Sequence, residues 1–482
     1  MRFRLSHIIF AYSLSAFALV AALSCSTNPA QEYGSETPVS LSPTSVEESL
    51  DTSEPVEIEE PESADTGEET GSNIFGEDRI ITIELDFAQN DFFQVLLENH
   101  ETSEYIEADL TIIDASGTHF YENVGVRLKG NSSMSHPGNK KPFKIDFNEF
   151  VIGQDHDGLK KLNFSNAFKD PSFLHEKIFF DVSRAAGVQA PRTNFANVYF
   201  NGELWGFYTV VEQIDDRFLE RNFGDDNGNL FKSTSEGSAD LQYRGPDQRN
   251  YEGSYAIKNN EEVNDWSDLI EFTDFITNSP IQVFENEIDQ WLNVQGFLRS
   301  AALDNLFSNL DSYTLSGRNY YLYHNMESGL WEWIKWDGNE AFGAYAYGVN
   351  EPMTALPVTF TESHKALLQK IFESETLTER YLNEVCVLVE DLFNPAEMNS
   401  RIDELSELVD SSVLADPNKM YPYENFVENL ERDISVQDPF IKREEGPPGM
   451  KSRSESEIPP MFGLKSFVAE KHAYVTSTLA CN

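Results

Sequence analysis

Apolar and polar residues alternate with a period of two through much of the first half of the chain. This alternation predicts strands at residues 79–87, 105–114, 120–130, 143–147, 160–165, 194–200 and 204–213. The dipeptide Asn201-Gly202, between the last two strands, is typical of a two-residue hairpin turn. The first half of the folded chain is therefore expected to be mostly β-structure.

Helical periodicity interrupts these strands at 89–100 and at 170–187. The second of these segments opens on Asp170-Pro171 and stops at Gly187, and both are boundary signals for a helix. Beyond about residue 258 the helical period takes over. It predicts helices at 265–276, at 289–309 and at several places between 362 and 479.

One strand pair, 318–324 and 330–336, is embedded among the later helices. A mostly β part followed by a mostly helical part is an α+β arrangement. We expect an N-terminal lobe at about 75–235 and a C-terminal lobe at about 258–482. No internal repeat is visible.

The first 25 residues have the composition of a bacterial signal peptide. A short basic stretch precedes an apolar run, and small residues lead to Cys25. They resemble a lipobox, in which the cysteine is lipidated, although Ala22 stands where Leu is usual. A lipoprotein in a bacterial cell membrane or outer membrane is the favoured prediction. Simple secretion comes second, and a single-pass anchor is disfavoured because no basic cluster follows.

An acidic linker is predicted at 26–74. It is rich in Ser, Thr, Glu and Pro, carries thirteen carboxylates and has no Lys or Arg, so it has too little apolar surface to fold. The whole chain has 35 basic and 82 acidic residues and a net charge of -47. This balance excludes nucleic acid as an expected partner. Cys386 and Cys481 remain after Cys25, and the sequence leaves open whether they pair.

Six ordered motifs carry a resemblance to a known family. They are GVRLKGNSS, KKPFKIDF, GLKKLNFSNAFKDPSF, AAGVQAPRTNFANVYFNGELWGFYTVVEQID, NYYLYHN and WDGNEAFG. Together they resemble the spore coat protein H family, usually called CotH kinases, over roughly residues 79–345. The resemblance implies a two-lobed fold similar to protein kinases, with ATP and a divalent metal, Mg or Mn, between the lobes.

Phosphoryl transfer needs cations on the phosphates, a carboxylate on the metal and a carboxylate near the acceptor hydroxyl. On the resemblance, Lys144 is expected to contact phosphate, with neighbouring Lys141 as the substitute. Arg127 belongs to a loop that could donate hydrogen bonds to phosphate. Glu176 could orient Lys144 as an ion pair. Glu212, where a lobe connection could run, could present its backbone to adenine.

Asp337 ends a predicted strand and is followed by Gly338, and it resembles the metal-binding Asp of kinases. Two positions later, where the family often has a second acid, stands Asn339, an amide that could ligate metal with less charge. Asp311 matches the position of the family's catalytic Asp. Asn319 could supply a further metal contact. The alternative for Asp337 is a surface turn without chemistry.

The resemblance implies an exported atypical kinase that transfers the γ-phosphate of ATP to Ser or Thr of secreted or surface proteins. Two alternatives stay open at this point. One is a non-catalytic surface protein that binds a partner or a cell-wall polymer with the same fold. The other is a nucleotidyl transferase that moves AMP on this scaffold.

Overall fold

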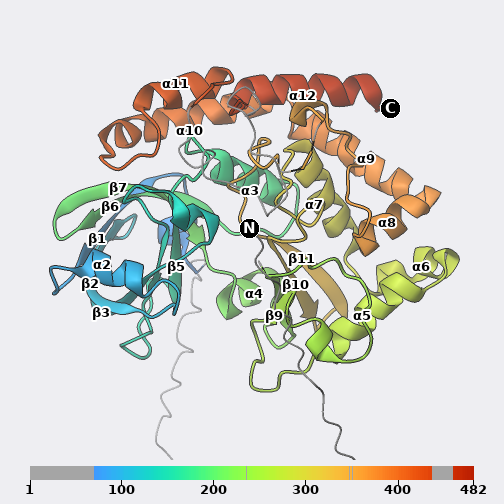
Figure 1. The fold of residues 1–482 in the computed structure, drawn as a ribbon, viewed down its shortest axis with the longest axis horizontal. Coiled ribbons are helices and arrows are strands. Elements are labelled where there is room, and N and C mark those ends of the chain that lie inside the picture. The colour runs from blue at the N-terminus through green and yellow to red at the C-terminus, as the bar shows by residue number, and fades with distance from the viewer. Residues whose placement is uncertain (1–69, 235, 347, 350, 437–459, 482) are drawn as a thin grey trace, which may run out of the picture. The chain divides into compact units, whose positions relative to one another are not determined.

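The computed structural model describes residues 70–436, apart from 235, 347 and 350, and residues 460–481. The predicted signal peptide, Cys25 and nearly all of the acidic linker lie outside the described residues. Within the described ranges, no helix has the length and hydropathy needed to span a membrane. The described part mixes sheets and helices, which confirms the α+β prediction (Figure 1).

Seven strands form a closed barrel in the order β1-β2-β3-β4-β5-β7-β6. Antiparallel neighbours make up most of it, and parallel pairing of β1 with β6 closes it. The apolar residue at every second position fills the interior, and all seven predicted strands are present. The strands are β1 (Ile80–Asp86), β2 (Ile106–Asp114), β3 (Gly117–Leu128), β4 (Phe143–Asp146), β5 (Lys161–Ser165), β6 (Thr193–Phe200) and β7 (Glu203–Glu212).

The predicted hairpin turn joins β6 to β7. Asn201 and Gly202 have φ of 50° and 77°, the positive values that a tight hairpin turn needs and that these two residues tolerate best. The short helices α1 (Ser72–Phe75) and α2 (Phe92–Glu98) lie around the barrel, and α4 (Asp216–Phe223), which follows β7, packs against strands of a second sheet.

Helix α3 (His175–Ala185) is shorter at its start than the predicted segment 170–187. Asp170 accepts hydrogen bonds from the backbone N–H groups of Ser172 (2.9 Å) and His175 (2.8 Å). A side chain that binds its own downstream backbone stabilises a turn in place of a helix. The helix therefore begins after this turn, and Glu176 lies in its first turn.

A second sheet has four strands in the order β11-β10-β8-β9. Its predicted half is the hairpin of β10 (Tyr320–Asn325) and β11 (Leu330–Lys335). Its other half, β8 (Leu230–Ser233) and β9 (Tyr255–Ile257), is not apparent in the sequence, because strands of four and three residues show no clear alternation. The embedded hairpin thus belongs to a larger sheet.

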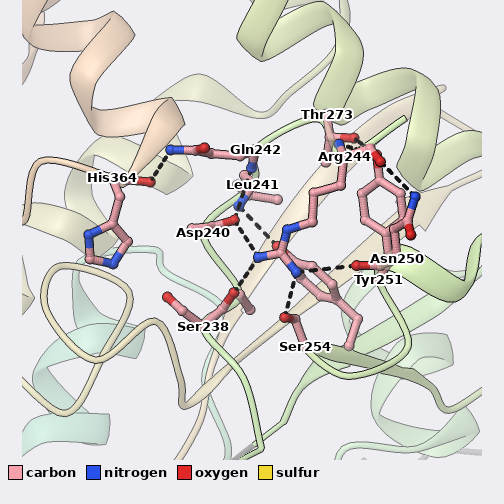
Figure 2. A network of polar contacts seen from close by, with 12 residues as sticks. Ser238, Asp240, Leu241, Gln242, Arg244, Asn250, Tyr251, Ser254, Thr273 and His364 are labelled. Atoms are coloured by element: carbon pink, nitrogen blue, oxygen red, sulfur yellow. Dashed lines mark hydrogen bonds and ion pairs between the residues drawn. The ribbon is translucent and has the colours of Figure 1, made fainter. Parts of the chain in front are cut away.

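Arg244 fixes the long loop between β8 and β9 (Figure 2). Its guanidinium donates to the hydroxyl of Ser254 (2.8 Å) and to a carboxylate oxygen of Asp240 (2.9 Å). The carbonyl of Asp240 in turn accepts from the hydroxyl of Tyr313 (3.1 Å). The loop is therefore hydrogen-bonded to Tyr313, two residues after Asp311.

The remaining elements are mostly helical. Among the described residues, four one-turn 3₁₀ helices accompany eight α-helices, and α10 packs against both β7 and α12. The α-helices are α5 (Ser267–Asn278), α6 (Ile281–Glu287), α7 (Val294–Leu306), α8 (Ala366–Glu373), α9 (Glu375–Asp391), α10 (Pro395–Ala415), α11 (Tyr423–Glu431) and α12 (Leu464–Thr478). Helix α7 starts later than the predicted segment 289–309, because Asn293 caps it by accepting from the N–H of Gly296.

A disulfide joins Cys386 of α9 to Cys481, just after α12, across a sequence separation of 95 residues. This resolves the pairing that the sequence leaves open.

Replacing both cysteines with Ser is expected to lower the free energy of unfolding by about 2–4 kcal/mol, because the unfolded chain regains the entropy of a long loop. Denaturant unfolding of the variant and of the oxidised parent measures this. Equal midpoints and slopes would contradict it.

Lys471 on α12 is fully buried without a carboxylate partner among the described residues. It donates to the carbonyl of Leu356 (2.8 Å) and to the hydroxyl of Ser308 (3.3 Å). Burial lowers the pKa of its ammonium to about 7. The unfolded chain therefore binds one more proton than the folded chain between about pH 7 and pH 10.

Stability should consequently rise with pH in this window, by up to about 1.4 kcal/mol per pH unit. In Lys471→Met this contribution is absent, so its free energy of unfolding should rise less steeply between about pH 7 and pH 9. Denaturant unfolding of both proteins at several pH values gives the two slopes. Parallel slopes would show that Lys471 titrates normally in the folded protein.

Candidate functional site

A polar cavity of about 470 Å³ lies between the barrel and the four-stranded sheet. On the barrel side, the cavity is lined by residues of β3, β4 and β5 and by the first turn of α3. On the side of the four-stranded sheet, it is lined by residues of β8, by the residue before β10 and by the residues after β11. Among the side chains that line the cavity are Arg127, Lys144, Glu176, Lys232, Asn319 and Asp337.

The barrel wall of the cavity is basic. Val126 and Leu128 point into the barrel, so alternation along β3 turns Arg127 and Lys129 outward. Lys144 on β4 is the cross-strand neighbour of Arg127. Its ammonium donates to the side-chain oxygen of Gln213 (2.7 Å). Burial and then the positive charge of Arg127 hold the pKa of Lys144 well below its ordinary value.

Two more lysines enter from the sheet, Lys232 on β8 and Lys258 after β9. The ammonium groups of Lys129 and Lys232 lie 5.5 and 5.4 Å from the ring centre of Trp336. Contacts of this kind with an aromatic face hold cations in place. The residue after this tryptophan is Asp337, so the cations beside Trp336 are followed along the cavity lining by a carboxylate.

Asp337 lies two residues after the end of β11 and is half-buried. Its φ of 55° is left-handed, a conformation that Asp and Asn tolerate better than most residues. A Cβ on the next residue, Gly338, would lie 2.4 Å from a ring carbon of Phe179, so glycine lets α3 pack closely here. Burial raises the pKa of Asp337, and Lys129 opposes that effect.

Asn319 brings Asp311 to the same edge of the sheet. Its side-chain amide donates to the carbonyl (2.7 Å) and to a carboxylate oxygen (3.0 Å) of Asp311. Its own carbonyl accepts from the backbone N–H of Trp336 (3.2 Å). The other carboxylate oxygen of Asp311, Oδ1, is buried and has no hydrogen-bond partner within the described residues.

A buried ion pair links the two segments that contain these acids. Lys335, two residues before Asp337, donates to Asp304 of α7 (2.7 Å). Asp304 also accepts from the side chain of Asn309 (3.1 Å), two residues before Asp311. Both members of the pair are nearly inaccessible to water. Asp304 therefore fixes the relative position of Asp311 and Asp337.

Glu176 enters the cavity from α3 and is 6% exposed. One of its carboxylate oxygens, Oε2, is buried and lacks a hydrogen-bond partner in the described part of the chain. Burial and the charge of Asp337 raise the pKa of Glu176 to about 7. The cation that most opposes this rise in the pKa of Glu176 is Lys129. From the sequence, Lys144 is the expected cationic partner of Glu176.

Comparison with known proteins gives the family. A family model described as CotH kinase protein matches residues 126–444. The chain belongs to the CotH kinase family. Inner spore coat protein H of Bacillus subtilis is 26% identical over 309 residues, which cover 63% of this chain and 80% of that protein. Invasin CotH2 of Rhizopus delemar is 22% identical over 324 residues, 62% of this chain and 51% of that protein.

In this CotH family member, two residues considered from the sequence lie apart from the cavity. Glu212 binds Arg192 (2.7 Å) and Arg221 (2.8 Å), and its backbone N–H donates to the carbonyl of Arg192. Lys141 donates to the carbonyls of Met134 (2.8 Å) and His136. Both side chains serve the structure of their own segments.

The cavity brings together the other predicted residues: Arg127, Lys144, Glu176, Asn319, Asp337 and Asn339 line it, and Asp311 adjoins Asn319. Sequence reasoning missed Lys129, Lys232 and Lys258. Lys129 has a signal, since it stands two residues after Arg127 on the same face of β3. Lys232 and Lys258 have none, because they depend on β8 and β9, which the sequence pattern does not predict.

The donor set suits a hard divalent cation. Asp337 supplies a carboxylate, and Asn319 and Asn339 supply amide side chains, whose oxygens Mg and Mn accept as ligands. Glu176 Oε2 in the same cavity is a buried acceptor that lacks a partner in the described residues, and a cation would satisfy it. Within the described ranges, no group of three or more His, Cys, Asp or Glu forms a metal cluster.

Proposed function

We propose that this protein is an exported atypical kinase that transfers the γ-phosphate of ATP, with Mg or Mn, to Ser or Thr of secreted or surface proteins. The observation that carries the proposal is the division of one cavity into a basic wall and an acidic edge. Lys129, Lys144 and Lys232 form the wall, and Asp311 and Asp337 form the edge. Phosphoryl transfer needs both at once.

Each group has a role in this proposal. Lys129, Lys144 and Lys232 bind and orient the phosphates, because ammonium groups form strong charge-assisted hydrogen bonds to phosphate oxygens. Asp337 and Asn319 would hold the metal ion, with Asn339 as a further amide donor. When bound, that ion would neutralise charge on the phosphates.

Asp311 would orient the acceptor and take the proton of its hydroxyl. Asn319 binds one carboxylate oxygen of Asp311, which leaves the buried Oδ1 to accept from the acceptor. Lys335 and Asp304 keep Asp311 near Asp337. Transfer then needs little further rearrangement of the protein.

Export is supported by the disulfide between Cys386 and Cys481, because such bonds persist mainly in oxidising compartments. The relatives' names agree with a surface role, since one is a spore coat protein and the other an invasin. The protein acceptor and the membrane attachment through Cys25 belong to the same proposal.

The mass of the modified acceptor tests this function. The purified protein is incubated with ATP, Mg or Mn, and a Ser- and Thr-rich acceptor protein, and the products are examined by mass spectrometry. A phosphate on Ser or Thr is the expected result. Addition of adenylate would instead establish a nucleotidyl transferase. An unmodified acceptor, together with no change in melting temperature on adding nucleotide, would favour a binding protein.

A further inference from the structure

The cavity has a charge opposite to that of the chain as a whole. Six Lys or Arg side chains line it, against three Asp or Glu side chains, although the protein has a net charge of -47. The basic side chains are Arg127, Lys129, Lys144, Lys232, Lys258 and Arg318, and the acidic ones are Asp170, Glu176 and Asp337. An excess of cations in a concave site attracts anions.

Two buried lysines outside the cavity are neutralised by carboxylates. Lys140 binds Asp416 and Lys335 binds Asp304, at 2.6 and 2.7 Å. Lys144 differs, since Arg127 is its cross-strand neighbour and Lys129 and Lys232 line the same cavity. Crowded ammonium groups repel one another, which costs free energy that a bound polyanion would recover.

The cationic groups are also held in position without a ligand. Gln213 accepts from Lys144 (2.7 Å) and from the side chain of Asn163 (3.2 Å). Trp336 contacts the ammonium groups of Lys129 and Lys232. A site with preorganised donors loses little entropy when it binds its ligand.

We propose that this cavity binds the polyphosphate chain of a nucleoside triphosphate through side-chain cations alone, so that binding needs no divalent metal while transfer does. The inference rests on the proposed function and adds the order of events. In ordinary kinases, metal ions neutralise much of the phosphate charge. Here six cationic side chains against three acidic ones leave an excess of three cations, which attracts the negative charge of an uncomplexed triphosphate.

The residues at the acidic edge of the cavity also favour phosphate binding before metal binding. Asn339 stands where the family often has a second acid, and an amide attracts a divalent cation less than a carboxylate does. The lysines would therefore bind the phosphates first, and the triphosphate would add the oxygen ligands that the metal still needs. A base is not required for this recognition, so inorganic tripolyphosphate should bind as well.

Titration calorimetry with the purified protein in excess EDTA tests the proposal, using ATP and inorganic tripolyphosphate as ligands. Both are expected to bind without metal and to compete with each other. Lys144→Met and Lys232→Met should each weaken binding by about tenfold, since each removes a charge-assisted contact. Arg249→Met is the control, because this exposed arginine pairs with Asp247 and does not line the cavity. Melting temperatures without ligand verify that the variants fold.

The outcomes separate this inference from the proposed function. Binding that appears only when Mg or Mn is added would overturn the inference and leave the kinase proposal standing. Binding in EDTA that Arg249→Met weakens as much as Lys144→Met would also overturn it, because the cavity would not be the site. Binding in EDTA that follows the cavity lysines, without phosphate on any acceptor, would support the inference and count against the kinase.

Discussion

Asp337→Asn is expected to reduce the rate of phosphate transfer by a factor of about 10²–10³, as loss of one group that stabilises transition-state charge does elsewhere. The substitution keeps the shape of the side chain and removes its charge. Asn tolerates the left-handed backbone at this position, where φ is 55°. The folded structure should survive, and ATP should still bind to Lys129, Lys144 and Lys232.

Label transfer from γ-labelled ATP and melting temperature are measured together for this variant. Asp155→Asn is a suitable control, because Asp155 is an exposed turn residue that accepts from the N–H of Gly158 and does not line the cavity. Wild-type transfer by Asp337→Asn would show that Asp337 is a turn residue without a chemical role. Loss of transfer with a large drop in melting temperature would show a structural role.

Lys140→Met is expected to destabilise the protein by about 3–5 kcal/mol, the usual cost of leaving one buried charge unpaired. Lys140 and Asp416 are both fully buried, and their ion pair spans 2.6 Å. Asp416 caps α10 and also accepts from the backbone N–H of Phe207 in β7 (3.0 Å). The pair therefore joins the segment before β4 and strand β7 to the C-terminal helices.

Denaturant unfolding measures this loss, and two variants interpret it. Lys160→Met breaks a pair with Asp216 that is about a third exposed on both sides, so it should cost less than about 1 kcal/mol. Adding Asp416→Asn to Lys140→Met removes the stranded charge and should restore part of the stability. Equal effects of Lys140→Met and Lys160→Met would contradict the importance of the buried pair.

The strands of the barrel could be predicted because their alternation is long and regular. Closure of the barrel could not, since β1 pairs in parallel with β6 and their partners Ile80 and Phe195 are far apart in sequence. Local pattern gives the type of an element, whereas pairing between distant elements depends on the whole chain. The start of α3 was missed for a local reason, the turn formed by Asp170.

The acidic edge of the cavity could be anticipated better than its basic wall. Asp337 and Asn319 stand at the ends of strands with clear patterns, so motif resemblance found them. Lys232 and Lys258 depend on β8 and β9, which are too short for their alternation to be read. The expected partner of Glu176 was Lys144, but the cation that most opposes the rise in the pKa of Glu176 is Lys129.

The most direct measurement of the central claim is a crystal structure of the protein with a non-hydrolysable ATP analogue and Mn. The triphosphate is expected in the cavity, with its oxygens within hydrogen-bond distance of Lys129, Lys144 and Lys232, and with Mn between the phosphates and Asp337. An analogue bound elsewhere on the protein, or a cavity that stays empty at saturating analogue, would contradict the assignment of this cavity as a phosphoryl-transfer site.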